Sequence, residues 1–310
     1  MARRELGPAA LRVAQAVLAA LPDGGEVTVG VSGGADPFAL ALGTLWAAPR
    51  KGVRAGAIVV DHQLQEGSGD IAAGVAEVLG ERGLPTRVVA VDVPDSPDGV
   101  EAAARDARLA ALSAPGHPVL LGHTLDDQAE SVLLGLLRGS GTRSLAGMAP
   151  VRGSFIRPLL DLRRADTVDA CRDWGVEPWH DPMNDDPRFA RVQARQALAT
   201  LNESFGRDLS ASLARTASLA RADAEYLDAV AAAASAGDTL DARALAELHP
   251  AIRRRAIHQW LTRRTPTVSQ AHVLAVAALV DDWRGQGAVA VPGGAVERVD
   301  GWLAFRGGRG

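Results

Sequence analysis

The sequence predicts an α/β protein: an open parallel sheet with helices on both faces, followed by a smaller, mainly helical C-terminal domain. Between residues 26 and 124, short apolar runs alternate with helical stretches. Such runs suit strands that are covered on both faces. Repeated strand–helix units of this length form a parallel sheet. From about residue 206 the chain becomes alanine-rich and helical instead, which predicts the second domain.

The elements of the first domain follow from this alternation. Residues 1–25 contain two arginines ahead of an Ala/Leu run, but Glu5, Arg12 and Gln15 interrupt it. We therefore expect an amphipathic opening helix and no signal peptide. A short apolar segment, a helix near 165–174 and a polar, proline-bearing loop follow the alternating region. The expected strands are 27–31, 57–61, 88–93 and 119–122, and the expected helices between and after them are 38–48, 71–82, 100–112 and 126–137.

The second domain is predicted from the change in composition, so we divide the chain into residues 1–209 and 210–310. The end of the chain alternates and turns at 292–294, which indicates a β-hairpin. Five arginines fall among residues 252–264 with no acidic residue between them, which favours a binding face. The expected helices of this domain are 209–236, 240–248, 251–263 and 268–282.

Composition excludes several classes of protein. Hydrophobic residues make up 47% and charged residues 23% of the chain, as in soluble globular proteins. No run approaches the roughly 18 apolar residues of a membrane span. Cys171 is the only cysteine, so an internal disulfide is excluded and the cytoplasm is the natural setting. A net charge of −4 argues against coating nucleic acid by charge alone.

The turn after the first strand predicts a phosphate site. There the strand runs into Ser32-Gly33-Gly34, followed by Ala35, Asp36, Pro37 and a helix. Adjacent glycines let the backbone approach a phosphate, and a helix N-terminus adds N–H donors. The loop is neither a Walker A nor a GxGxxG motif. The two glycines alone fit a simple tight turn equally well, but Ser32, Asp36 and the position after the first strand favour nucleotide binding.

Polar side chains also follow the second strand. Asp61 and His62 end that strand, and Glu101, Arg105 and Arg108 share one face of a later helix. A ladder of solvated ion pairs is the ordinary outcome for such a helical face.

The fourth strand is followed by an acidic pair. His123 ends the strand, Asp126 and Asp127 open the next helix, and Arg138 begins an RGSG turn. An acidic pair at a helix N-terminus is commonly only a cap. Its position beyond the carboxyl end of a parallel strand also suits a ligand site.

Two further segments carry arginines. Residues 156–166 read IRPLLDLRRAD, and residues 179–195 read WHDPMNDDPRFARVQAR. Within the second segment, Arg191 and Arg195 share a helical face, and Arg188 lies just before them. This arrangement fits a nucleic-acid-binding patch or an exposed basic helix end.

Taken together, these motifs resemble a known family. The loop resembles the SGGxD[ST] signature of PP-loop ATP pyrophosphatases. The later segments, in order, resemble the VDHxL, HHxDDQxET…RGSG, RPLL and DxSN…RNxxR segments of the tRNA(Ile)-lysidine synthases. The resemblance covers about residues 24–205 and is weaker but compatible beyond them. It implies a Rossmann-like PP-loop ATPase fold and an ATP-using, adenylate-forming ligase that modifies tRNA in the cytoplasm.

The resemblance also implies roles for individual residues, with ATP and Mg²⁺ as cofactors. The residues implied to act in catalysis are Asp36, Arg105, Asp126 and Asp127. Those implied to bind the nucleotide are Ser32, Gly33, Gly34, Ala35, Asp36, Pro37, His62, His123 and Arg138. Those implied to hold Mg²⁺ are Asp36 and Asp127, because hard cations prefer carboxylate oxygen. Those implied to bind tRNA are Arg188, Arg191 and Arg195.

The reaction that the resemblance implies has two steps. ATP adenylates the C2 carbonyl oxygen of the wobble cytidine in tRNA(Ile) with a CAU anticodon, releasing pyrophosphate. The ε-amine of free L-lysine then displaces AMP. Activation is needed because this oxygen is a poor leaving group at neutral pH. The implied partners are the tRNA and lysine but no membrane, and a homodimer is compatible with the sequence.

The sequence argues against other PP-loop enzymes but leaves one alternative open. Thiolating members generally need paired cysteines, whereas this chain has Cys171 alone. Amide-forming members normally carry a glutaminase module or different downstream motifs, and the acidic-pair segment does not fit them. Pro37, Met183 and Val192 depart from the family pattern, where Ser or Thr, Ser, and Asn are usual. A proline at the first helical position is compatible with folding, but it removes a hydroxyl and an N–H. One lost charge-assisted hydrogen bond costs about 1.5–3 kcal/mol. A degenerate paralogue that binds tRNA without turnover is therefore the alternative.

Overall fold

The computed structural model describes residues 6–63, 65, 67–94, 99–139, 141–181, 185–265 and 267–308. The chain divides into two compact units, Met1–Ser218 and Leu219–Gly310. The division falls inside helix α9 (Leu209–Ser235), whereas the boundary expected from composition coincides with the start of that helix. In the described part of the chain, no helix is both long enough and apolar enough to cross a membrane.

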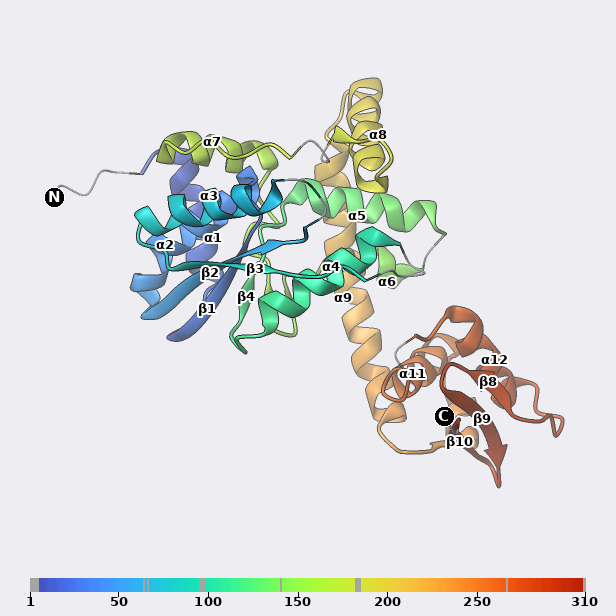
Figure 1. Ribbon diagram of the computed structural model, residues 1–310. Helices are drawn as coiled ribbons and strands as arrows, with labels where there is room; N and C mark the ends of the chain where they lie inside the picture. Colours follow the sequence, from blue (N-terminus) through green and yellow to red (C-terminus); the bar gives the residue numbers. More distant parts are fainter. Residues whose placement is uncertain are drawn as a thin grey trace. The chain divides into compact units, whose positions relative to one another are not determined.

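The first unit is built on a six-stranded sheet with the strand order β3-β2-β1-β4-β6-β5 (Figure 1). All neighbouring strands pair in parallel except β5 and β6, which form an antiparallel edge. This arrangement confirms the predicted parallel sheet, and the short apolar segment after residue 150 adds the β5–β6 edge. The strands are β1 (Gly25–Val31), β2 (Val53–Asp61), β3 (Thr86–Ala90), β4 (Val119–Leu120), β5 (Val151–Arg152) and β6 (Phe155–Ile156).

Helices cover both faces of this sheet, because successive side chains of a strand point to opposite sides. In β2, Ala57 and Val59 join the larger core, to which α1, α2, α3 and α7 contribute. Ile58 instead joins a smaller core with Leu112 of α4. The helices of the unit, with one short 3₁₀ turn, are α1 (Pro8–Ala20), α2 (Ala35–Ala47), η1 (Ala48–Lys51), α3 (Ser68–Glu81), α4 (Val100–Ser113), α5 (Leu125–Leu137), α6 (Thr142–Leu145), α7 (Arg164–Trp174) and α8 (Ala190–Phe205).

The strand order creates one switch point. The chain builds β1, β2 and β3 toward one side and then places β4 on the other side of β1. The turns that follow β1 and β4 therefore open a crevice, which is where open parallel sheets bind ligands. Gly122 permits their close approach, since a Cβ at this position would lie 3.0 Å from the carbonyl carbon and oxygen of Asp36.

The second unit contains a four-stranded antiparallel sheet in the order β7-β10-β9-β8. The β8–β9 hairpin turns at the predicted place, and Trp260 is fully buried in the core. The expected helix 240–248 is wrong at its start, because Leu240 and Asp241 form β7 and pair with β10. Asp241 then caps α10 by accepting two backbone N–H groups. The elements are β7 (Leu240–Asp241), α10 (Ala242–Glu247), α11 (Pro250–Thr262), α12 (Gln270–Asp281), β8 (Val289–Val291), β9 (Gly294–Val299) and β10 (Trp302–Gly307).

The arginines of residues 252–264 hold this unit together more than they form a binding face. Arg253 is buried and donates to backbone carbonyls at the end of α10. Arg255 forms a 2.7 Å ion pair with Asp228 of α9. Arg263 and Arg264 donate to backbone carbonyls as well. Four of the five arginines therefore bind groups of their own unit, so the basic face is smaller than the sequence predicted.

Replacing Gly122 with alanine tests the close approach at the switch point. We expect Gly122→Ala to lower the free energy of unfolding by about 1–3 kcal/mol, because the added methyl group meets backbone that cannot rotate away. Gly74, in the middle of α3, is the matched control, since nothing lies within 4 Å of its added Cβ. Gly74→Ala should stabilise by about 0.5–1 kcal/mol. Urea unfolding measures both, and equal effects would contradict the close contact.

Candidate active site

The loop between β1 and α2 has the form of an anion-binding turn. Gly33 has a φ of 85°, and a Cβ there would lie 2.9 Å from Val75 Cγ2, so only glycine fits. Gly34 is the N-cap of α2 and makes no side-chain capping bond. The first N–H groups of a helix have no partner within it and attract anions. On the other side of the loop, the Trp179 N–H donates to the Gly33 carbonyl at 2.9 Å.

Pro37 is the third residue of α2, not the first as expected, because the helix already begins at Ala35. The first helical bond runs from the Phe38 N–H to the Gly34 carbonyl at 3.1 Å. The N–H that proline lacks therefore belongs to the first turn, where no intrahelical acceptor exists. The substitution leaves the hydrogen bonds within the helix intact and removes only a donor that faces away from the helix.

Asp36 points from the first turn of α2 into the crevice. Its carboxylate accepts a hydrogen bond from the Thr167 hydroxyl and one from Arg164 Nε at 3.3 Å. Its pKa is raised to about 6: burial is the main cause and the charge of Asp127 adds to it, while the Thr167 and Arg164 contacts oppose the shift. A carboxyl group held in this way gains from an additional cation.

The acidic pair at the start of α5 is both a cap and part of the crevice. Asp127 Oδ2 accepts the Thr124 N–H at 2.8 Å and the Thr124 hydroxyl at 3.0 Å, which closes a capping box. Its other oxygen binds Arg164 at 2.6 Å. Burial opposes ionisation, but Arg164 and the Thr124 N–H outweigh it and lower the pKa of Asp127. Asp126 binds Arg163 at 2.9 Å and accepts the Arg164 backbone N–H at 2.7 Å.

Arg164 and Glu130 complete this cluster, and sequence reasoning did not select either as a site residue. Besides Asp127, the Arg164 guanidinium reaches Asp36 at 3.3 Å and Glu130 at 3.4 Å. The Glu130 side chain is only 2% exposed, and its Oε1 also binds Arg195 at 2.8 Å. Its Oε2 is buried without a hydrogen-bond partner. We call Asp36, Asp126, Asp127 and Glu130 the acidic set.

Three arginines form a second cluster beside the crevice. Burial lowers the pKa of the Arg108 guanidinium, and the nearby positive charges of Arg191 and Arg105 lower it further. Within the described residues, Arg108 Nε and the Nδ1 atoms of His62 and His123 are buried without partners. Burial also lowers the pKa of both histidines, that of His123 to about 3. Because both imidazoles stay neutral at neutral pH, the arginines carry the charge here. We call Arg105, Arg108 and Arg191 the arginine set.

Not every expected site residue is brought to the crevice. Arg138 is exposed at the far end of α5, ~17 Å of helix rise from Asp127 at 1.5 Å per residue. Arg188 is exposed and pairs with Asp186 at 2.6 Å, ahead of α8. Arg195 lies on α8 as expected, but it forms an ion pair with Glu130 of the acidic set. It is therefore not part of a separate basic patch on the surface. Val192 is buried on the same helix, and Met183 lies outside the described residues.

The acidic set has the donor chemistry for a nucleotide-bound Mg²⁺. In the described part of the chain, no three His, Cys, Asp or Glu side chains converge as a complete metal cage. Mg²⁺ commonly needs only one or two protein carboxylates, because phosphate and water oxygens supply its remaining ligands. Asp36 and Asp127 meet that requirement, and Glu130 Oε2, which has no hydrogen-bond partner among the described residues, leaves one further acceptor open.

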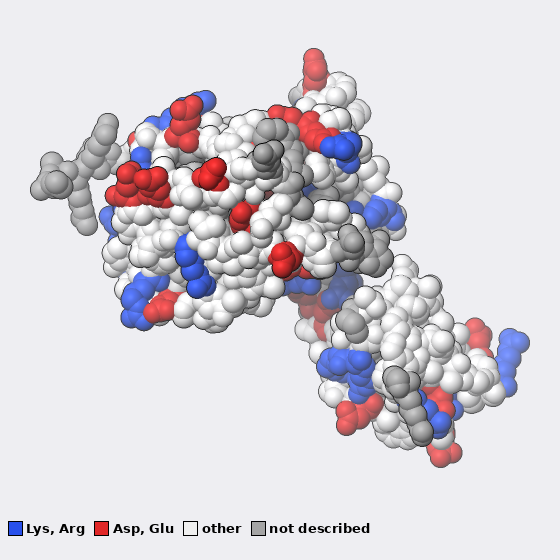
Figure 2. Space-filling view, viewed as in Figure 1, with Lys and Arg blue, Asp and Glu red and all other residues white. Residues whose placement is uncertain are grey.

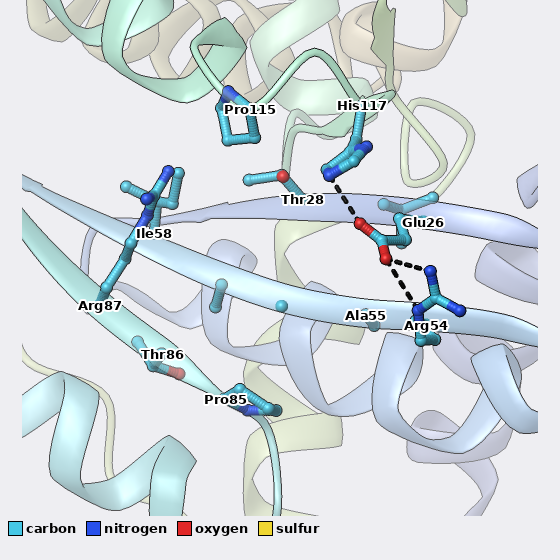
Figure 3. A pocket seen from close by; sticks show the side chains of 13 residues that line it. Glu26, Thr28, Arg54, Ala55, Ile58, Pro85, Thr86, Arg87, Pro115 and His117 are labelled. Carbon is cyan, nitrogen blue, oxygen red and sulfur yellow. Dashed lines mark hydrogen bonds and ion pairs between the residues drawn. The ribbon is translucent and has the colours of Figure 1, made fainter.

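A cavity of about 420 Å³ lies at the other end of the strands, around the amino ends of β1, β2 and β3 (Figure 3). Glu26 there accepts Arg54 Nε at 2.8 Å and pairs with His117 Nε2 at 2.7 Å. Its lining contains none of the expected site residues. Parallel sheets bind nucleotides at the carboxyl edge of their strands, so this cavity is no part of the candidate active site.

Comparison with known proteins agrees with the geometry. The PP-loop domain family matches residues 9–201, and the TilS substrate binding domain family matches residues 240–304. The tRNA(Ile)-lysidine synthase of Cutibacterium acnes is 49% identical and covers 98% of both chains. That of Leifsonia xyli is 45% identical, covering 92% of this chain and 91% of its own. The U34-tRNA thiolase NcsA from Methanococcus maripaludis has a TM-score of 0.55 at 17% identity, covering 67% of this chain and 78% of its own, and shows the fold alone.

Cys171 offers a test of how tightly the elements behind Asp36 pack. It is buried, its Sγ lies 3.5 Å from the Ala35 carbonyl oxygen, and burial raises its pKa to about 12. At pH 8 only about one thiol in ten thousand would be ionised. We expect no labelling by a thiol reagent in native protein and one equivalent in guanidinium chloride. Rapid labelling of native protein would contradict the packing of α7 against α2.

Proposed function

The chain belongs to the tRNA(Ile)-lysidine synthase family, and from that premise we propose that it joins the ε-amine of free lysine to C2 of the wobble cytidine in a tRNA(Ile) with a CAU anticodon. ATP would activate the C2 oxygen as an adenylate, with release of pyrophosphate and then AMP. One observation carries the proposal: the loop before α2, the acidic set and the arginine set, in which Arg108 Nε has no partner among the described residues, meet at one switch point.

The loop and α2 would hold the phosphates. The backbone N–H groups of residues 33–36 and the dipole of α2 favour an anion at this position. Asp36 and Asp127 would hold Mg²⁺, which would supply charge neutralisation on the phosphates. Trp179 supports the loop through its bond to the Gly33 carbonyl, so the donors are positioned before the nucleotide arrives. Such pre-organisation lowers the cost of reaching the transition state.

The acidic set would hold the lysine side chain. Asp127 and Glu130 present carboxylate oxygens on one face of α5, three residues apart. Glu130 Oε2 has no partner, and a buried carboxylate oxygen without one is costly. An ammonium group carries three donors and would satisfy it. The same acids would orient the amine toward the adenylated carbon.

The arginine set would meet the RNA or the reacting phosphate. Arg108 is a half-buried cation whose near neighbours, Arg191 and Arg105, are also cations, so an anion bound there would stabilise it. Neutral His62 and His123 beside it offer hydrogen bonds without adding charge. Charge that develops on phosphate during adenylation would be stabilised there.

The second unit would contribute further tRNA contacts, since it matches the TilS substrate binding domain. On the face drawn in Figure 2, acidic and basic side chains are interspersed rather than gathered by sign. With a net charge of −4, we infer that binding relies on a limited number of local phosphate contacts. The dependence of affinity on salt would then be shallow, because each phosphate contact adds about one unit to the slope.

A catalytically degenerate, tRNA-binding relative is the second candidate, and Pro37 is the observation that favours it. The proline fits the helix, yet it leaves the first turn with one fewer donor for phosphate. Val192 is a buried apolar residue at a position where the family pattern has a polar one. ATP turnover separates the two functions.

The deciding experiment measures AMP and pyrophosphate release from ATP, with free lysine and unmodified CAU-anticodon tRNA(Ile) supplied or withheld. Wild type and Pro37→Ser are compared side by side. We expect release that requires both tRNA and lysine, with Pro37→Ser equal to or faster than wild type. If neither protein releases AMP although both bind the tRNA, the chain is a degenerate relative.

Arg108 of the arginine set should lower the stability of the ligand-free protein and strengthen the binding of tRNA or ATP. We expect Arg108→Met to raise the free energy of unfolding of ligand-free protein by about 1–2 kcal/mol, because it removes a half-buried cation that the charges of Arg191 and Arg105 destabilise. Binding of tRNA or ATP should weaken at least tenfold, an effect of the size of one charged hydrogen bond. Urea unfolding and binding titrations measure the two effects.

Arg105→Met is the matched control, because Arg105 is exposed on the same helix. Its effect on stability should stay within about 0.5 kcal/mol. A destabilised Arg108→Met protein that binds both ligands normally would assign Arg108 a purely structural role.

A further inference from the structure

Arg164 occupies the place where the proposed substrate cations would bind. Its guanidinium lies 2.6 Å from Asp127, 3.3 Å from Asp36 and 3.4 Å from Glu130. These acids come from α2 and α5, while Arg164 opens α7. Together the three contacts raise the pKa of Arg164 above its ordinary value. The carboxylates proposed to hold Mg²⁺ and the lysine ammonium are thus already held by one internal cation.

Competition for one oxygen follows from these distances. A metal–ligand distance is about 2.1 Å for Mg²⁺, and an ammonium bonds carboxylate oxygen at about 2.7–2.9 Å. A guanidinium nitrogen already stands 2.6 Å from Asp127 Oδ1, and its positive charge would repel a second cation at that oxygen. A substrate cation that binds Asp127 Oδ1 therefore has to compete with the Arg164 side chain.

We propose that Arg164 is a resident counter-ion that holds the acidic set in the ligand-free enzyme and is displaced by the substrate cations. This inference rests on the proposed function for the identity of those cations. It adds a residue that controls when they bind. The guanidinium neutralises carboxylates that would otherwise repel one another in a buried place, and it excludes stray cations while no nucleotide is present.

The displacement needs only a side-chain movement. The Arg164 backbone N–H donates to Asp126 Oδ2 at 2.7 Å, a bond that does not involve the guanidinium. Helix α7 can therefore stay fixed at its N-terminus while the side chain rotates. The released guanidinium would find its new partner in the phosphates of a nucleotide on the adjacent α2 loop. Binding of the cation and binding of the nucleotide would then favour each other, because the cation releases Arg164 from the carboxylates and the phosphates accept the released guanidinium.

Binding of Mg²⁺ alone and of L-lysine alone to the nucleotide-free full-length protein tests the proposal. Calorimetric titration and thermal unfolding are run on wild type, Arg164→Gln and Arg172→Gln. Arg172 lies on the same helix and pairs with Asp169 on the surface at 2.6 Å, so its variant is the matched control. We expect weak binding to wild type and Arg172→Gln. Arg164→Gln should bind at least one of the two cations at least tenfold more tightly and melt higher when that cation is present.

Arg164→Lys is the second variant, in case Arg164→Gln does not fold without a cation. A lysine ammonium is compact and cannot span three carboxylates, so affinity should lie between those of wild type and Arg164→Gln. Equal cation affinity in wild type and in every folded Arg164 variant would overturn the proposal and make Arg164 a permanent structural ion. These titrations use no tRNA and measure no turnover. A protein without ligase activity would therefore still give a clear result for the role of Arg164.

Discussion

Buried carboxylates must be paired, and this constraint organises the candidate active site. Asp36, Asp127 and Glu130 approach one another at the ends of two helices, an arrangement that repulsion and lost hydration would oppose. Arg164 makes it stable by binding all three. The same contacts fix α7 against α2 and α5. The chemistry we propose requires these acids to lie close together and to keep oxygens that can bind a substrate cation. Arg164 holds the three carboxylates together, and Glu130 Oε2 has no hydrogen-bond partner among the described residues.

The topology explains why such a network forms at this place. The reversal of strand order between β1 and β4 leaves two neighbouring turns, and each turn opens a helix whose N-terminus attracts negative charge. The acidic residues of those first turns are Asp36 on α2 and Asp126 and Asp127 on α5. Gly122 allows the backbones of the two turns to come close. The anion-binding loop and the acidic set are thus two consequences of one sheet arrangement.

Local sequence patterns were sufficient for the parallel sheet, the helices around it, the loop at Gly33 and the acidic pair, because each depends on residues near in the chain. They were insufficient for Arg164, which lies within an ordinary arginine pair and gains its meaning from partners about 35 to 130 residues away. For the same reason, the arginines of residues 252–264 suggested a binding face, although Arg253 and Arg255 bind their own unit. Leu240 was assigned to a helix because its strand partner, β10, lies at the end of the chain.

In the proposed reaction, the acidic set presents a lysine ε-amine to an activated cytidine. The most direct measurement is mass spectrometry of nucleosides from CAU-anticodon tRNA(Ile), after incubation with the protein, ATP and lysine labelled with ¹⁵N at the ε position. We expect a labelled nucleoside in which the ε-nitrogen replaces the C2 oxygen of the wobble cytidine. Unmodified cytidine, or a lysine adduct attached through its unlabelled α-nitrogen, would contradict it.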